Sequence, residues 1–209
     1  MRLHLNKGGI RALGVAESFR PGQKWSVLAG VVMRGDLVVD GLSIHRASVG
    51  GDDATSSIVS LYRRLKRNDV NVLLVSGCIL SLYNIIDVDE LARRSAVPVV
   101  CLTYRETAGI EDAIRSHFPD GAERKLVAYR KLGERVRIPL KTGHAVFART
   151  SGLTAFEAKG VVDTFVLQGS LPEPVRVARL LARAVMSSRL SSRRGSGAPS
   201  GRRPRAPAS

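Results

Sequence analysis

Residues 25–45 have the sequence WSVLAGVVMRGDLVVDGLSIH, which predicts two β-strands joined by a tight turn. The first half is apolar almost throughout, the second is rich in β-branched residues, and Arg34-Gly35-Asp36 between them is a turn signal. Another apolar run covers residues 10–17 and is followed by the turn dipeptide Pro21-Gly22. Three consecutive strands with short connections predict an antiparallel meander.

The rest of the chain alternates between helical and strand patterns. Apolar residues at helical spacing are separated by wholly apolar runs, which are typical of strands buried on both faces. The expected helices cover residues 53–67, 87–95 and 109–118, and the expected strands cover residues 70–75, 98–103 and 144–149. Thr154 and Glu157 form a capping-box pattern, which predicts a helix over residues 154–165. Two prolines around Glu173 predict the start of a last helix, which ends at Met186.

These elements predict one α/β domain over residues 1–186, with a mixed sheet and helices on both of its faces. Residues 125–137 are strongly charged and fit a loop, a helix or an edge strand equally well. Residues 187–209 contain six arginines, no acid and little apolar surface, which predicts a disordered basic tail. The net charge of the chain is +15, of which about +9 belongs to the domain. Such a charge either attracts nucleic acid or reflects an arginine-rich genome.

The two cysteines, Cys78 and Cys101, lie in apolar runs and are expected to be small buried residues on strands. No Cys-x-x-Cys spacing occurs, which argues against a structural zinc site. No apolar run is long enough to span a membrane, and the first residues lack a signal-peptide pattern. We therefore expect a cytoplasmic protein without a membrane partner.

Two adjacent acids, Asp52 and Asp53, follow Gly50-Gly51 at the predicted entrance of the first helix. Neighbouring carboxylates repel unless a positive group meets them, such as a helix N-terminus, an arginine or a metal ion. Asp53 is either the N-cap of the helix or a ligand, and both roles are compatible if Asp52 is the ligand. The nature of this positive group decides whether the protein is an enzyme or a binding protein.

Several segments resemble one archaeal family in sequence and in order. They are VMRGD at 32–36, VDG at 39–41, DAT at 53–55, NIID at 84–87 and PEPVRVA at 172–178. Over about residues 10–186 the chain is similar to the family catalogued as domain of unknown function number 99. That family is a distant relative of endonuclease V. The resemblance therefore implies a ribonuclease H-like fold and a metal-dependent endonuclease that acts on altered bases in DNA or RNA.

The resemblance also implies where Mg²⁺ or Mn²⁺ would bind. Nucleases of this fold take carboxylates from the first strand, from the entrance of the first helix and from the end of the fourth strand, and the metal activates water. The candidate metal ligands are Glu17, Asp52, Asp53 and Asp87, of which the first three are also the candidate catalytic residues. Ala16 and Ser76 stand where related proteins have acids, so this set is incomplete.

The same acids have structural interpretations. Glu17 is then an exposed strand end, and Asn84 and Asp87 cap the helix that follows them. Asp40 lies in an apolar strand and needs a partner, for which Arg34 and Arg46 are available locally.

Arg176 and Arg179 stand at helical spacing and are candidate nucleic-acid-binding residues, because paired guanidinium groups bind phosphate well. Alternatively, Glu173 pairs with Arg176 and orients the last helix. Two functions remain open from the sequence. One is a metal-dependent endonuclease, and the other is a protein that binds nucleic acid or nucleotide at a degenerate nuclease site without cutting.

Overall fold

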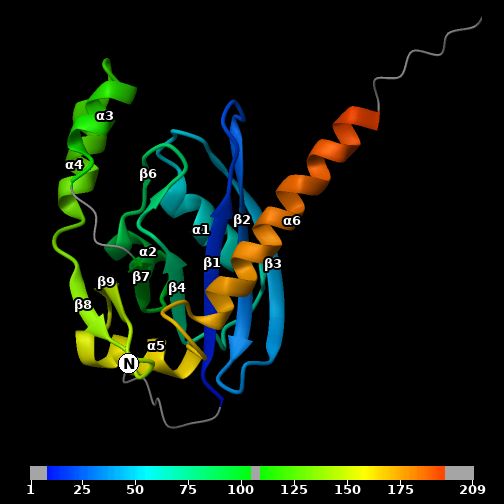
Figure 1. Cartoon of the computed structure of the whole chain (residues 1–209), viewed down its shortest axis with the longest axis vertical. Helices are drawn as coiled ribbons and strands as arrows, with labels where there is room; N and C mark the ends of the chain where they lie inside the picture. The colour runs from blue at the N-terminus through cyan, green and yellow to red at the C-terminus, as the bar shows by residue number, and fades with distance from the viewer. Residues whose placement is uncertain (1–8, 105–108, 196–209) are drawn as a thin grey trace, which may run out of the picture.

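A seven-stranded sheet organises the protein, whose computed structural model describes residues 9–104 and 109–195 (Figure 1). Its strand order is β3-β2-β1-β4-β7-β9-β8, and a separate two-stranded ribbon contains β5 and β6. The strands are β1 (Arg11–Ser18), β2 (Trp25–Arg34), β3 (Val39–Ser48), β4 (Val72–Ser76), β5 (Ile79–Leu80), β6 (Asn84–Ile85), β7 (Val99–Thr103), β8 (Val136–Pro139) and β9 (Ala145–Ser151).

The first three strands form the predicted antiparallel meander. β4 then pairs parallel to β1, and β7 pairs parallel to β4. β9 pairs antiparallel to β7, and β8 closes that side of the sheet. The mixed sheet predicted from the sequence is therefore confirmed. β1, β4 and β7 point the same way, so their carboxyl ends share one edge of the sheet, which is the usual ligand-binding edge of open α/β sheets.

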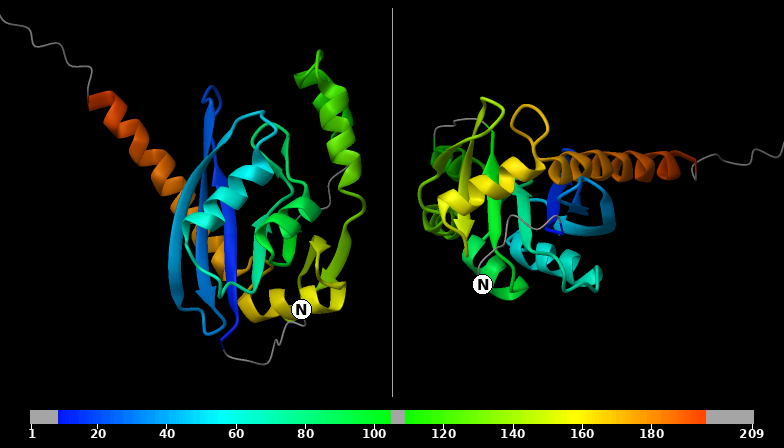
Figure 2. Two further views of the ribbon diagram at one scale, coloured as in Figure 1. Left: turned by 180° about the vertical axis from the view of Figure 1, so that it is seen from behind. Right: turned by 90° about the horizontal axis from the view of Figure 1, so that it is seen from below.

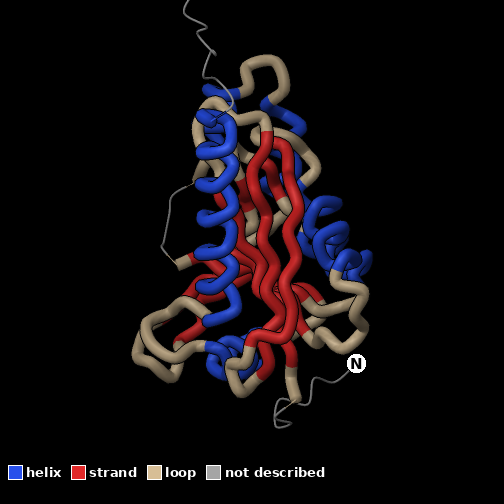
Figure 3. The backbone as a smooth tube through the Cα atoms, turned by 90° about the vertical axis from the view of Figure 1, so that its right-hand side faces the viewer, coloured by secondary structure: helices blue, strands red, loops and turns tan. Residues whose placement is uncertain are grey.

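Helices cover both faces of this sheet, as predicted (Figures 1 and 2). α1 and α2 pack on one face, and α5 and α6 pack on the other, where α6 lies along the strands (Figure 3). α3 and α4 pack on each other, and α4 also contacts β6. The helices are α1 (Ala54–Arg64), α2 (Val88–Ser95), α3 (Glu111–His117), α4 (Ala122–Lys131), α5 (Ala155–Phe165) and α6 (Glu173–Gly195).

Side chains along β1 alternate between the two faces, as the pleat of a strand requires. Leu13 and Val15 are buried in the cluster that contains the apolar residues of α1 and α2. Ala12 lies in the cluster with α5, and Ala16 packs against Ala178 of α6. This alternation places the successive residues at positions 16 and 17 on opposite faces of the sheet.

Several local predictions are confirmed, and others need correction. The capping box of α5 is present, because Thr154 Oγ1 accepts from Glu157 N at 3.2 Å and Glu157 Oε2 accepts from Thr154 N at 2.9 Å. The undecided segment 125–137 divides into the end of α4 and the start of β8. Both cysteines are buried, but Cys78 lies just after β4 rather than within a strand.

The last helix continues beyond Met186, where the sequence predicts its end, and reaches Gly195. The rest of the predicted basic tail lies outside the described residues. Among the helices that the structure describes, none is long and apolar enough to cross a bilayer.

Asp40 on β3 is held by two arginines that are remote in sequence, so the predicted local partners, Arg34 and Arg46, are wrong. Arg11 Nε donates to Asp40 Oδ2 at 2.6 Å, and Arg67 Nη2 donates to the same oxygen at 2.8 Å. These hydrogen bonds lower the pKa of Asp40 to about 2. Both partners are distant in sequence: Arg11 lies at the amino end of β1, and Arg67 lies in the segment after α1. These two segments meet β3 only in the folded chain, so the local sequence could not reveal the pairing.

Asp40 is expected to make the protein sensitive to acid. A carboxyl whose pKa is lowered by folding stabilises the native state above its unfolded pKa, and this stabilisation is lost as the pH falls from about 4 to about 2. The variant Asp40→Asn should therefore melt at a lower temperature than the unmodified chain at neutral pH, and the difference should vanish near pH 2. Thermal unfolding midpoints measured across this range check the expectation, and a difference independent of pH would contradict it.

Candidate functional site

The turn before α1 and the loop around β6 are joined by hydrogen bonds, and together they carry three of the four predicted acids. Gly50 N donates to Ser81 O at 3.0 Å, and Asp87 N donates to Thr55 Oγ1 at 2.9 Å. The acids predicted from distant parts of the sequence are thus neighbours in the fold. Their individual partners determine what they can do.

Asp52 is met by a lysine, which the sequence did not single out. Lys125 of α4 is buried, and its Nζ lies 3.2 Å from Asp52 Oδ1 and 2.9 Å from Gly51 O. The same ammonium donates to Tyr83 O at 3.1 Å and lies 4.6 Å from the centre of the Phe118 ring. Lys125, together with the exposed Arg124, whose Nη2 lies 3.4 Å from Asp52 Oδ2, supplies the positive charge that the acidic pair requires, and both residues bind α4 to the turn before α1.

Asp53 occupies the N-cap position of α1, but its carboxylate does not cap the helix. Its oxygens accept from Ser48 N at 3.1 Å, from Ser48 Oγ at 2.9 Å and from Asn84 Nδ2 at 2.7 Å. Partial burial raises the pKa of Asp53, but these hydrogen bonds outweigh it and lower the pKa below its ordinary value. Asn84 Oδ1 accepts from Ala54 N at 2.9 Å, so an asparagine from another loop satisfies the first turn of α1.

Asp87 caps α2, as its structural interpretation expects. Its Oδ1 accepts from Glu90 N at 3.0 Å, and its Oδ2 lies 2.6 Å from Lys131 Nζ. Burial raises the pKa of Asp87, and the bonds from Lys131 and Glu90 N reverse this to a net lowering. Asn84 does not cap this helix, because its side chain serves α1.

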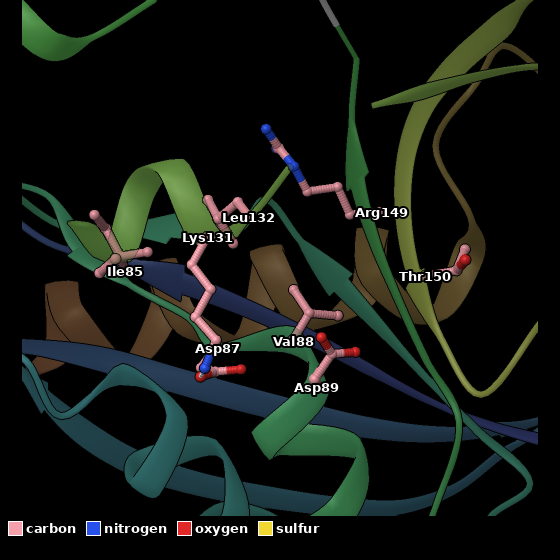
Figure 4. A pocket seen from close by; sticks show the side chains of 9 residues that line it. Ile85, Asp87, Val88, Asp89, Lys131, Leu132, Arg149 and Thr150 are labelled. Carbon is pink, nitrogen blue, oxygen red and sulfur yellow. Dashed lines mark hydrogen bonds and ion pairs between the residues drawn. The ribbon is translucent and has the colours of Figure 1, made fainter. Parts of the chain in front are cut away.

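Asp87 also borders a cavity of about 110 Å³ between α2, α4 and β9 (Figure 4). The cavity is lined by Ile85, Asp87, Val88, Asp89, Ala128, Lys131, Leu132, Arg149 and Thr150. Lys131 points to Asp87, and Arg149 donates to Gly133 O at 2.8 Å. Small-molecule sites usually measure about 300–1,000 Å³, so this cavity does not fit a nucleotide.

Glu17 on β1 is largely buried and not an exposed strand end. Its Oε2 has no hydrogen-bond partner among the described residues, and neither has the buried Ser81 Oγ. Burial raises the pKa of Glu17, and the neighbouring Ser26 and Ser81 offset only part of this rise. Glu17 lies on the face of α1, whereas Ala16 faces α6.

The residues at these places do not fit a divalent cation. Within residues 9–104 and 109–195, no group of three carboxylate, histidine or cysteine side chains converges as metal ligands would. Mg²⁺ is bound through oxygen ligands, usually one or two carboxylates with water and phosphate. Here Asp52, Asp53 and Asp87 already bind protein donors, and Ala16 offers only a methyl group.

An arginine occupies the end of the fourth strand. Arg179 of α6 donates to Ser76 Oγ from Nε at 3.1 Å and from Nη2 at 2.6 Å. Its guanidinium carbon lies 4.7 Å from the centre of the Tyr104 ring, just after β7. Arg176 behaves differently, because it pairs with Glu173, and its Nε donates to Glu173 Oε2 at 2.8 Å. The two candidate phosphate-binding arginines thus have separate roles in the fold.

Comparison with known proteins identifies a family and relatives that this chain resembles. A family model described as Endonuclease dU matches residues 8–186. A relative from Pyrobaculum calidifontis, described as a UPF0215 protein, is 37% identical over 174 residues, which are 83% of this chain and 95% of the relative. The predicted archaeal kinship is therefore confirmed, although the family number expected from the sequence is not among these descriptions.

Two solved structures share the fold. A protein of unknown function from Archaeoglobus fulgidus has a TM-score of 0.72 and 26% identity, over 84% of this chain and 98% of that one. Endonuclease V from Ciona intestinalis, solved with a 24mer DNA containing an inosine followed by a ribo-adenosine, has a TM-score of 0.57 and 13% identity, over 86% and 87% of the two chains. The mixed sheet thus resembles that of endonuclease V. The family model matches residues 8–186, which are most of this chain, so the chain belongs to the Endonuclease dU family.

Proposed function

We propose that this chain binds nucleic acid at the carboxyl edge of its sheet and does not cut it through a divalent metal. The observation that carries the proposal is the contact of Arg179 with Ser76. A positive charge lies there where the endonuclease V resemblance implies a carboxylate. A guanidinium attracts phosphate and repels a divalent cation, so this edge favours an anionic ligand.

The charge of the whole chain supports the same ligand class. Lysine and arginine outnumber aspartate and glutamate by 33 to 18. Such an excess raises the local concentration of polyanions and speeds their association with the protein. It does not select a sequence or a base, so any selectivity must come from the edge of the sheet.

The preferred ligand that we propose is a DNA strand with a deaminated base. The family description names dU, and the endonuclease V of Ciona intestinalis was solved with inosine-containing DNA. Uracil and hypoxanthine are the deamination products of cytosine and adenine. Each altered base carries a carbonyl oxygen where its parent base carries an amino group, and we propose that the chain recognises the altered base through this oxygen.

Fluorescence anisotropy with labelled single-stranded oligonucleotides tests this function. The strands differ at one position, which holds deoxyuridine or its parent deoxycytidine, or deoxyinosine or its parent deoxyadenosine. We expect binding that weakens steeply with salt, because phosphate contacts release counterions, and a lower Kd for the two altered strands. Absence of binding, or a Kd independent of salt, would reject the proposal.

A metal-dependent endonuclease is the second candidate, and the family description favours it. Within the chain it is supported by the buried Glu17 Oε2, which has no hydrogen-bond partner in the described structure. The same oligonucleotides, incubated with Mg²⁺ or Mn²⁺ and separated on a denaturing gel, distinguish the candidates. Nicking that disappears on Asp52→Ala with Asp53→Ala supports the second candidate, and intact strands support the first.

A further inference from the structure

Arg179 is fixed in place from three elements of the fold. Its side chain projects from α6, donates to the Ser76 hydroxyl at the end of β4 through two nitrogens, and stacks on the Tyr104 ring, which follows β7. A guanidinium held in this way loses little conformational freedom when it binds a ligand. The contacts therefore organise the side chain in advance rather than leave it mobile in solvent.

Within residues 9–104 and 109–195, the positive charge of Arg179 is not neutralised by an acid. Among the described residues, no carboxylate forms an ion pair with it, whereas Arg176, one turn earlier, pairs with Glu173. Nε and Nη2 each donate one hydrogen to the neutral Ser76 hydroxyl, and Nη1 has no acceptor in the described structure. A partly buried cation without a counter-charge is costly, and an anionic ligand would remove that cost.

Tyr104 adds a second, independent observation. Its hydroxyl oxygen is buried and has no hydrogen-bond partner among the described residues. A tyrosine hydroxyl is protonated at neutral pH and can donate a hydrogen bond, and burial raises the pKa of Tyr104 further. Buried donors in native proteins are nearly always paired, so an orphaned one points to an absent acceptor.

Both unpartnered groups are donors, and their chemistry selects the ligand. Guanidinium and phenol hydrogens need acceptor oxygens, and the net positive charge requires that these oxygens carry negative charge. A phosphate group offers several such oxygens on one atom, and arginine is the residue most suited to it. A metal ion offers no acceptor and would be repelled.

We propose that Arg179, Ser76 and Tyr104 form a phosphate-binding subsite, in which the guanidinium takes the place that a divalent cation has in nucleases of this fold. The subsite rests on the proposed function, because it takes a backbone phosphodiester of the bound strand. Arg179 contacts the phosphate, Ser76 positions the guanidinium, and Tyr104 supplies both the stacking surface and a further donor. One phosphate of the strand is thereby anchored at the ends of β4 and β7.

The test compares variants by their Kd for a labelled oligonucleotide and by the salt dependence of that Kd. Arg179→Gln should weaken binding about tenfold or more, because a charge-assisted hydrogen bond is lost. It should also reduce the slope of log Kd against log salt by about one. Arg179→Lys should keep the slope and weaken binding by a smaller factor, and Tyr104→Phe should weaken it about threefold.

Arg34→Gln is the matched control, because it removes the same charge from the last residue of β2, which pairs with the start of β1, at the opposite end of that strand from Arg179. It should change Kd and slope much less than Arg179→Gln. Equal behaviour of these two variants, while the unmodified chain binds normally, would overturn the subsite and leave the proposed function intact. Failure of the unmodified chain to bind would reject both. If Arg179→Gln does not fold, as judged by circular dichroism, the Kd values of Arg179→Lys and Tyr104→Phe replace it as the test. A Kd unchanged from the unmodified chain in both variants would then overturn the subsite.

Discussion

Replacing Asn84 with aspartate is expected to reduce the free energy of unfolding by about 3–5 kcal/mol, because it leaves a buried charge without a partner. Asn84 is fully buried, and its amide nitrogen donates to Ser48 O at 2.8 Å and to Asp53 Oδ1 at 2.7 Å. Aspartate has the same shape but only accepts hydrogen bonds when ionised. Asn84→Asp therefore removes both donors and sets a second carboxylate against Asp53.

The loss should depend on pH in a defined direction. Burial and the neighbouring carboxylate would raise the pKa of the introduced acid in the folded state, so protonation at low pH restores a donor and reduces the loss. Urea denaturation at neutral pH and near pH 4 measures both values. Asn84→Ala is the control without charge, and it should lose less, about 2 kcal/mol, at both pH values. Equal stability of Asn84→Asp and the unmodified chain would refute this account of the turn before α1.

Replacing Gly14 with alanine is expected to cost about 3 kcal/mol or more, because β1 and the start of α6 touch at this point. A β-carbon on Gly14 would overlap the carbonyl group of Pro174 and would lie 2.6 Å from Val175 N. Backbone atoms cannot rotate away as a flexible side chain does, so α6 would have to move. The midpoint and slope of a urea unfolding curve measure the loss.

The same change should also weaken nucleic-acid binding, because α6 carries Arg179 to Ser76. Gly9→Ala is the control, since a β-carbon there meets no atom within 4 Å. It should change the free energy of unfolding by less than about 0.5 kcal/mol. If Gly14→Ala is as stable as Gly9→Ala, the close packing of α6 on β1 is wrong, and the placement of Arg179 fails with it.

The architecture was predictable because its signals are local. The turn Arg34-Gly35-Asp36 between two apolar runs specifies the meander, and wholly apolar runs predict β4 and β7 in the middle of the sheet. The capping box at Thr154 marks the start of α5. α4 was not predictable, because its charged sequence lacks a clear apolar stripe and buries chiefly Lys125 and Leu126.

The site was only half predictable, because its partners are distant in sequence. The sequence placed Asp52 and Asp53 correctly at the entrance of α1, but the cation that meets Asp52 comes from the segment whose structure was undecided. Arg179 was a candidate, yet nothing local pairs it with Ser76, which is 103 residues away. Nothing in the sequence distinguished Lys125 from the other basic residues of its segment, such as Arg124 and Lys131.

The measurement that tests the central claim most directly is binding and cleavage of a deoxyuridine-containing strand with and without divalent metal. Labelled strand and protein are mixed in chelator, in Mg²⁺ and in Mn²⁺ at matched ionic strength. Anisotropy then gives the Kd, and a denaturing gel shows the strand length. A guanidinium in place of the metal predicts that binding is no tighter in Mg²⁺ or Mn²⁺ than in chelator, because the metal only competes for the phosphates, and that the strand stays intact throughout. Binding that requires the metal, or metal-dependent nicking of the strand, would contradict it.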